Sequence, residues 1–282
     1  MTPTPGQGDR RAAGAGGGGG DGHSREHGHV EIRAYAELGD FLAPHERGRA
    51  IRRPFRPHQT VKDVVEAAGI PHTEVDLIVV GGEPVAFDHR PAAGDRLAVY
   101  PVFETLDIGP VARLRPAPLR DPRFVVDVHL GRLARLLRLV GLDVRWASDL
   151  TDDEMVAISR AERRIVLTRD RGLLKRRLVT HGLFVRSDRP LDQVVDVLRR
   201  LDLGDRLAPF TRCLACGDVL VPVPKAEVLD RLQPLTRQHY DEFHRCAGCG
   251  RVYWRGSHHA GLAAVVDAIR AAMMGPWPST TG

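Results

Sequence analysis

Four cysteines place the strongest constraint on what this chain can fold into. They form two Cys-x-x-Cys-Gly motifs, which contribute Cys213, Cys216, Cys246 and Cys249. Two such motifs bring four thiolates to one tetrahedral zinc ion, and the glycine after each pair permits the tight turn whose amides face the sulfurs. Because four thiolates leave no open coordination position, the spacing predicts a structural zinc in a C-terminal ribbon. A redox Cys-x-x-Cys, disulfides and unbound thiols are the alternatives.

The segments around these motifs predict further features of the ribbon. Between the motifs we expect a helix at about residues 225–232, and His239 and His244 either substitute for a ligand or lie on the surface. After the second motif, Tyr253 and Trp254 either stack on a base or complete the last strand of the ribbon.

The length and composition are those of a soluble protein with two or three domains. With 282 residues, 43% hydrophobic and 27% charged, the chain is neither wholly disordered nor fibrous. No apolar run approaches the roughly 18 residues that cross a membrane. Residues 1–28 are rich in glycine and histidine and lack the apolar core of an export signal, so we expect a disordered tail on a cytoplasmic protein.

Prolines and charge divide the ordered chain. Residues 110–122 contain four prolines, which predict a stiff linker. Before it, residues 29–109 hold nine Lys/Arg and thirteen Asp/Glu, a balance of −4. After it, residues 123–203 hold seventeen and twelve, a balance of +5, so an anionic partner is expected there. The expected parts after the linker are a central domain at 123–204, the ribbon at 205–260, and a helix and tail at 261–282.

The first part predicts a small β-grasp domain. A strand-like run starts at Val30, a helix capped by Thr60 follows over residues 61–68, and Gly81-Gly82 mark a hairpin turn between later strands. The strings VGGEPV and GDRLAVYP resemble the ubiquitin-like sulfur carriers. Those carriers act through a free C-terminal Gly-Gly, whereas this chain continues beyond Gly109. We therefore expect this domain to serve for docking or packing, with a protein partner as one option.

The central part predicts a parallel sheet with helices on its faces. Short β-branched runs alternate with helical stretches, which is typical of βαβ units. The expected strands are 124–128, 144–148, 165–168 and 183–187, and the expected helices are 130–140, 153–162, 172–178 and 191–201.

Acidic side chains follow the carboxyl ends of these strands, where such sheets bind ligands. They are Asp127, Asp152, Asp153, Asp170 and Asp188. Carboxylates gathered at one edge repel one another unless a divalent cation neutralises them, and hard oxygen ligands select magnesium or manganese, here above all at Asp127 and Asp170. Such sites activate water for phosphodiester hydrolysis in two-metal nucleases.

The acids also have structural interpretations. A capping-box pattern formed by Thr151 and Glu154 accounts for Glu154 as a helix-starting residue, and the same interpretation extends to Asp152 and Asp153. Asp170 is a candidate helix N-cap, and Asp188 a candidate turn residue. Asp127 is harder to explain in this way, because a carboxylate between an apolar strand and a helix is costly to bury without a partner.

Three strings in this part resemble a known nuclease family. FVVDVHLGRLARLLRLVGLDV, DDEMVAISRAERRIVLTRDRGLL and LFVRSDRPLDQV are similar to the Mut-seven C-terminal RNase family, a branch of the PIN-like nucleases, over about residues 123–258. The resemblance implies a PIN-like sheet and metal-dependent cleavage of RNA. Matched by motif, the metal-binding acids are Asp127, Asp152 and Asp170, with Asp188 a looser fourth and Thr168 orienting a ligand.

Basic side chains are candidates for holding RNA phosphates. The best placed are Arg132, Arg169, Arg171, Arg255 and His258, and further candidates are Arg135, Arg138, Lys175, Arg176 and Arg177. The solvent faces of helices in an arginine-rich chain explain the same residues without RNA.

Together these features predict a cytoplasmic metal-dependent ribonuclease, an α/β protein with a PIN-like parallel sheet between a β-grasp domain and a zinc ribbon. Its expected reaction is attack of water on phosphorus, which leaves a 5′-phosphate if it follows the course that the resemblance implies. The alternative is a non-catalytic RNA- or ribosome-binding adaptor that binds through the ribbon and the basic helices. A third reading, a sulfur-transfer accessory protein, requires processing after Gly109.

Overall fold

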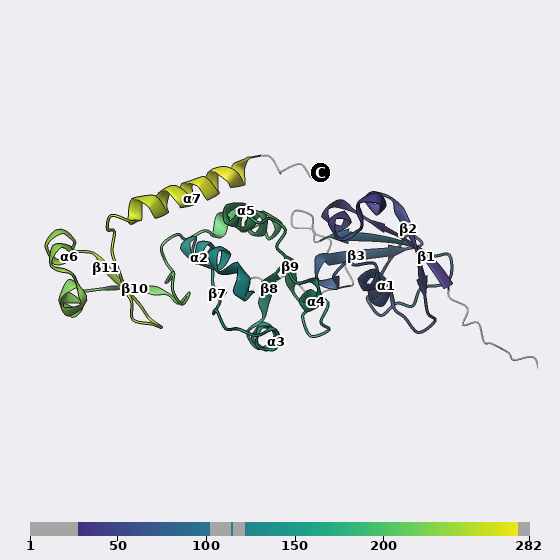
Figure 1. Ribbon diagram of the computed structural model, residues 1–282, viewed down its shortest axis with the longest axis horizontal. Coiled ribbons are helices and arrows are strands. Elements are labelled where there is room, and N and C mark those ends of the chain that lie inside the picture. Colours follow the sequence, from purple (N-terminus) through teal and green to yellow (C-terminus); the bar gives the residue numbers. More distant parts are fainter. Residues whose placement is uncertain (1–27, 102–113, 115–121, 276–282) are drawn as a thin grey trace, which may run out of the picture.

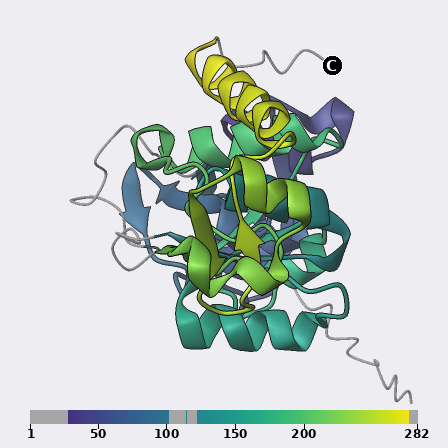
Figure 2. The same ribbon diagram turned by 90° about the vertical axis from the view of Figure 1, so that its left-hand side faces the viewer.

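The computed structural model describes residues 28–101, 114 and 122–275. The expected tail lies outside these residues except for Gly28, and so does nearly all of the expected linker. Three units follow one another along the long axis: a β-grasp domain, a central α/β domain and a ribbon (Figure 1). Helices α7 (His259–Met274) and α3 (Asp152–Glu162) lie on opposite sides of the molecule when it is viewed from the ribbon end (Figure 2).

The N-terminal unit is a five-stranded mixed sheet with one α-helix. Its strands are β1 (Gly28–Ala34), β2 (Ala50–Phe55), β3 (Val75–Val80), β4 (Glu83–Val85) and β5 (Arg96–Pro101). They are ordered β2-β1-β5-β3-β4, with the parallel pair β1 and β5 at the centre. Helix α1 (Val61–Ala67) covers one face and begins at a capping box formed by Thr60 and Asp63. The predicted β-grasp is confirmed.

Local sequence explains these elements. Val30, Ile32 and Ala34 alternate along β1 with exposed residues, so one face of the strand is buried under α1. Gly81 and Gly82 both have positive φ, 60° and 93°, and form the predicted two-residue turn between β3 and β4. Short 3₁₀ helices complete the domain: η1 (Ala36–Phe41), η2 (Pro44–Glu46) and η3 (His72–Glu74).

The central unit is a four-stranded, all-parallel sheet between two layers of helices. Its strands are β6 (Arg123–Val126), β7 (Val144–Arg145), β8 (Arg164–Thr168) and β9 (Gly182–Phe184), in the order β7-β6-β8-β9. One face is covered by α2 (Gly131–Leu139) and α5 (Pro190–Arg200), and α7 packs against the same core through Ile269. The other face is covered by α3 and α4 (Arg171–Leu174).

Several central elements are shorter than the sequence predicts. The expected strand at 144–148 ends at Arg145, and the expected helix at 172–178 is the single turn α4. The chain leaves that helix through successive turns, because Val179 must return to the buried face of the sheet before β9 begins.

The ribbon is a three-stranded antiparallel sheet of β10 (Leu220–Val223), β11 (Phe243–Cys246) and β12 (Val252–Tyr253). The predicted helix at 225–232 is wrong: two 3₁₀ turns, η6 (Lys225–Glu227) and η7 (Leu229–Arg231), stand there. Val228, between them, has φ −123° and breaks the helical course. An α-helix, α6 (Pro234–His239), begins only at the next proline. Within the described residues, no helix is long and apolar enough to span a membrane.

Candidate active site and metal centre

The carboxyl ends of β6 and β8 bring two of the predicted acids together around one hydroxyl. These strands are hydrogen-bonded neighbours, with Val126 paired to Leu167, so the residues that follow them lie side by side. Asp127 Oδ2 accepts a hydrogen bond of 2.5 Å from the hydroxyl of the fully buried Thr168. The same hydroxyl accepts the backbone N–H of Asp170 at 2.9 Å. Thr168 therefore links Asp127 to the segment that carries Asp170.

Both acids also cap the helical turns that follow them. Asp127 Oδ1 accepts the N–H of His129 at 3.0 Å, and Asp170 Oδ1 accepts the N–H of Gly172 at 2.6 Å. The N-cap interpretation of Asp170 is thus confirmed. It still leaves Asp170 Oδ2 without a hydrogen bond to any residue that the structure describes, so this oxygen remains available to a ligand.

The other three acids are exposed, and two of them form ion pairs with arginines. Asp153 forms an ion pair of 2.5 Å with Arg176, and its side chain is 90% exposed. Asp188 pairs with Arg169 and is 84% exposed, and Asp152 is exposed in the first turn of α3. Among residues 28–101 and 122–275, four cysteines alone form a group of three or more His, Cys, Asp or Glu ligand atoms within 4.8 Å of one another. The acids do not converge that closely.

The start of α3 is the capping box that the sequence suggested. Glu154 N–H donates to the hydroxyl of Thr151, while Glu154 Oε2 accepts from the backbone and hydroxyl of Thr151 at 2.8 and 2.7 Å. These hydrogen bonds lower the pKa of Glu154. This residue is fully accounted for as a helix cap.

The basic candidates fall into different surroundings. Arg132, Arg255 and His258 are exposed. Arg169 is engaged with Asp188, and the guanidinium of Arg171 lies over the rings of Phe41 and Phe184, 5.0 and 5.4 Å from their centroids. The β-grasp domain therefore occupies one of the arginines predicted to contact RNA.

Arg138 was interpreted either as a phosphate ligand or as a solvent-facing residue, and both interpretations are wrong. It is only 2% exposed and donates to the carbonyls of Val144 at 3.1 and 3.2 Å and Ala215 at 2.7 Å. Burial lowers its pKa, and the nearby Cys216 and Cys213 oppose that effect. Its spacing could have revealed this position: it follows Ala134 by four residues and so lies on the buried stripe of α2.

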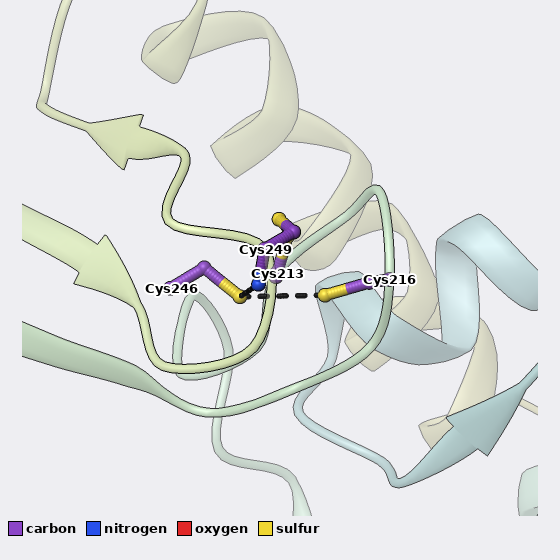
Figure 3. Close-up of side chains that lie close together, drawn as sticks. All are labelled: Cys213, Cys216, Cys246 and Cys249. Carbon is purple, nitrogen blue, oxygen red and sulfur yellow. Dashed lines mark hydrogen bonds between the residues drawn. The ribbon is translucent and has the colours of Figure 1, made fainter.

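The four cysteines meet at the contact between the ribbon and the central domain (Figure 3). Cys216 Sγ lies 3.3 Å from Cys246 Sγ, and Cys213 Sγ lies 3.6 Å from Cys249 Sγ. A zinc ion with bonds of about 2.3 Å to four sulfurs holds them ~3.8 Å apart, so the cluster has the size of a tetrahedral site. The four thiols can hold one metal ion without a histidine.

The surroundings of these thiols differ. Burial raises the pKa of Cys213, but hydrogen bonds from the Tyr253 hydroxyl at 3.0 Å and from backbone amides outweigh it and lower that pKa to about 6. Burial raises the pKa of Cys216 to about 12. The Tyr253 hydroxyl is thus bound within the cluster, which supports the interpretation that this residue completes the ribbon. Trp254 packs beside Phe243 and stays 37% exposed.

Gly217, after the first motif, has no room for a side chain. Its φ is +89°, and a Cβ there would lie 2.5 Å from the carbonyl oxygen of Val144 and 2.9 Å from Arg138 Nε. The first cysteine turn therefore packs directly on the backbone of the central domain.

Comparisons with known proteins agree with this architecture. A family model described as "Mut7-C RNAse domain" matches residues 122–266, just over half of the chain, and one described as "Mut7-C ubiquitin" matches residues 28–107. Two crystal structures of small archaeal modifier protein 1 from Haloferax volcanii are similar to the chain at 23% and 22% identity. They cover 27% and 28% of this chain and 99% and 100% of their own, with TM-scores of 0.22 and 0.23. A comparison with curated proteins gives no match. The chain therefore belongs to the Mut7-C RNAse domain family and carries the associated ubiquitin domain ahead of the RNase domain.

Proposed function

We propose that this protein is a metal-dependent ribonuclease of the cytoplasm that hydrolyses RNA phosphodiester bonds at the carboxyl edge of the central sheet. The observation that carries the proposal is the cluster of Asp127, Thr168 and Asp170 on adjacent parallel strands of an RNase-family domain. Its donors are carboxylate and hydroxyl oxygens, which suit magnesium or manganese.

In the proposed site, Asp127 and Asp170 would hold the cation, and Thr168 orients Asp127 through its hydrogen bond. A divalent cation bound there would supply a nucleophilic water at neutral pH and offset charge on the phosphate. The oxygen of water forms a bond to phosphorus as the P–O3′ bond breaks. One proton of the water ends on the leaving 3′ oxygen, so the products are a 5′-phosphate and a 3′-hydroxyl. Asp152, Asp153 and Asp188 stay predictions, because among the described residues they form no group of three or more ligand atoms of the size that holds a metal ion.

We assign RNA binding to the exposed basic residues that flank this edge, and a structural zinc ion to the four cysteines. Arg132 comes five residues after Asp127 and Arg169 directly precedes Asp170, while Arg255 and His258 are exposed residues that follow the last strand of the ribbon. Zinc suits the ribbon because four sulfur donors close its coordination shell.

The proposal is tested by incubating the purified protein with labelled single-stranded and structured RNA in manganese, magnesium or EDTA. Asp127→Asn and Asp170→Asn should each lower metal-dependent cleavage about a hundredfold, because each removes a charged metal ligand. Asp267→Asn, an equal change at an exposed site on α7, is the control. Cleavage that persists in both variants would refute the assigned acids.

The second candidate is the RNA- or ribosome-binding adaptor. The observation that favours it is that Asp153 and Asp188 each form an ion pair with an arginine, as acids with a structural role do. Retention of RNA by the wild-type protein without cleavage under any metal would select this function.

A further inference from the structure

The β-grasp domain docks on β9, the edge strand of the central sheet. The contact centres on Glu74 at the end of η3, whose side chain is fully buried. Its carboxylate accepts the backbone N–H of Phe184 and hydrogen bonds from Arg200 at 2.6 Å and Arg186 at 3.2 Å. Figure 1 shows β9 and α4 at the side of the central domain that faces β3 and α1. An acidic residue of one domain thus satisfies a backbone N–H on the free strand edge of the other.

The charge of Glu74 is maintained by its partners. Burial raises its pKa, but the two guanidiniums outweigh burial and hold the pKa below its ordinary value. Removing one of these partners while the domains stay docked would leave the other charge buried and unpaired, which is costly. The ion pair therefore fixes how the two domains fit together.

A second contact is made by Phe41, the last residue of η1. The guanidiniums of Arg171 and Arg186 lie 5.0 and 5.3 Å from its ring centroid, and the ring of Phe184 meets it edge-on at 5.4 Å. Arg171 also donates to the carbonyl of Phe41 at 3.3 Å. One aromatic side chain of the β-grasp domain thus holds two arginines of the central domain.

Arg171 and Arg186 belong to the segments that follow β8 and β9. Arg171 directly follows Asp170, and Arg186 comes two residues before Asp188. The segments are also joined to each other, because Val185 N–H donates to the carbonyl of Thr168 at 2.9 Å. Lys175, just after α4, is anchored to the carbonyl of Glu66 at 2.7 Å. The β-grasp domain therefore contacts the segments that follow β8 and β9, on the Asp170 side of the acidic edge.

From this arrangement we infer that the ubiquitin-like domain is a positioning part of the nuclease site, in which Phe41 and Glu74 fix the ends of β8 and β9 so that Asp170 stays in register with Asp127. The inference rests on the proposed function. It gives the ubiquitin-like domain a structural role in the intact protein. Phe41 and Glu74 are positioning residues, since neither reaches Asp127 or Asp170.

The test compares full-length Phe41→Ala and Glu74→Gln with Phe41→Tyr, which keeps the ring, and with Glu46→Gln. Glu46 forms an ion pair with Arg53 inside the β-grasp domain, at 2.8 Å, so it matches the charge change without touching the interface. Hydrogen exchange at residues 168–172 and 184–188, Mn²⁺ affinity, and kcat and KM for RNA cleavage are measured on each protein.

In Phe41→Ala and Glu74→Gln, hydrogen exchange at residues 168–172 and 184–188 should become about tenfold faster, because local opening becomes easier. Exchange at ribbon residues 243–246 should stay unchanged. Mn²⁺ affinity should fall about fivefold and kcat about tenfold or more with little change in KM, because small misplacements of catalytic groups are costly. Phe41→Tyr and Glu46→Gln should match the wild type. If Glu74→Gln does not fold, Phe41→Ala beside Phe41→Tyr carries the same comparison.

Faster exchange in the two segments with unchanged Mn²⁺ affinity and kcat would overturn the inference. Unchanged exchange in Phe41→Ala and Glu74→Gln would overturn it as well. Neither result would contradict the proposed nuclease function. A wild-type protein that neither binds Mn²⁺ nor cleaves RNA would refute the proposed function and, with it, the positioning of a metal site.

Discussion

At the scale of single residues, the hydroxyl of Thr168 is the most informative group at the acidic edge, because it donates to Asp127 and accepts from the Asp170 amide. Thr168→Val keeps the shape and removes both hydrogen bonds. We expect Mn²⁺ affinity and cleavage to fall about tenfold, since a hydrogen bond to a charged group contributes about 1.5–3 kcal/mol. Calorimetric Mn²⁺ titration measures the effect. Thr168→Ser should restore it, and a fully active Thr168→Val protein would exclude this role.

Arg138 gives a prediction about stability. Arg138→Met leaves the buried carbonyls of Val144 and Ala215 without their donor. We expect the free energy of unfolding to drop by about 2–3 kcal/mol, measured by urea denaturation. Arg135→Met changes an exposed arginine of the same helix and should stay within about 0.5 kcal/mol of wild type. Equal effects in the two variants would mean that the buried hydrogen bonds contribute nothing.

At the scale of elements, the capping box separates helix formation from metal binding at the start of α3. Thr151→Ala removes the side chain that accepts Glu154 N–H, so the protein should lose about 1 kcal/mol of stability. Thermal unfolding reports the loss, and Thr151→Ser is the control. Mn²⁺ affinity should be unchanged. A weakened Mn²⁺ affinity would instead place Asp152 or Asp153 in the metal site.

Sequence patterns predicted the elements whose causes are local. The strand alternation of β1, the Gly81-Gly82 turn and the cap at Thr60 depend on near neighbours, and all are present. What the patterns missed depends on distant partners. Glu74 and Arg200 are 126 residues apart, and no local signal joins them. Of the candidate site, the cysteine cluster and the pairing of Asp127 with the segment of Asp170 follow from sequence, because motif spacing and adjacent parallel strands fix both.

At the scale of the whole molecule, the metal in the ribbon is expected to fasten one end of the chain to the central domain. Purified protein should contain about one zinc per chain, and removing it with a strong chelator should expose the β10–β12 amides to exchange while the β6–β9 amides stay protected, because metal binding is coupled to folding in such sites. Metal analysis and exchange measure this. Full protection after complete metal removal would show that packing alone holds the ribbon.

The opposite net charges of the first two domains are partly paired where the domains meet. The net charges of −4 and +5, counted from the sequence, suggested an external anionic partner for the central domain. Part of that positive charge is instead neutralised internally, where Glu74 meets Arg186 and Arg200. The exposed arginines outside this contact, such as Arg132, are the ones that our proposal assigns to an external polyanion.

The covered strand edge at β9 has a consequence for solubility. In the intact chain, η3 shields this edge and Glu74 takes up the N–H of Phe184. A fragment that began at residue 122 would present a bare strand to its neighbours, and bare edges invite pairing between copies. The β-grasp domain therefore protects the intact chain from self-association, and the RNase-family domain without it should aggregate.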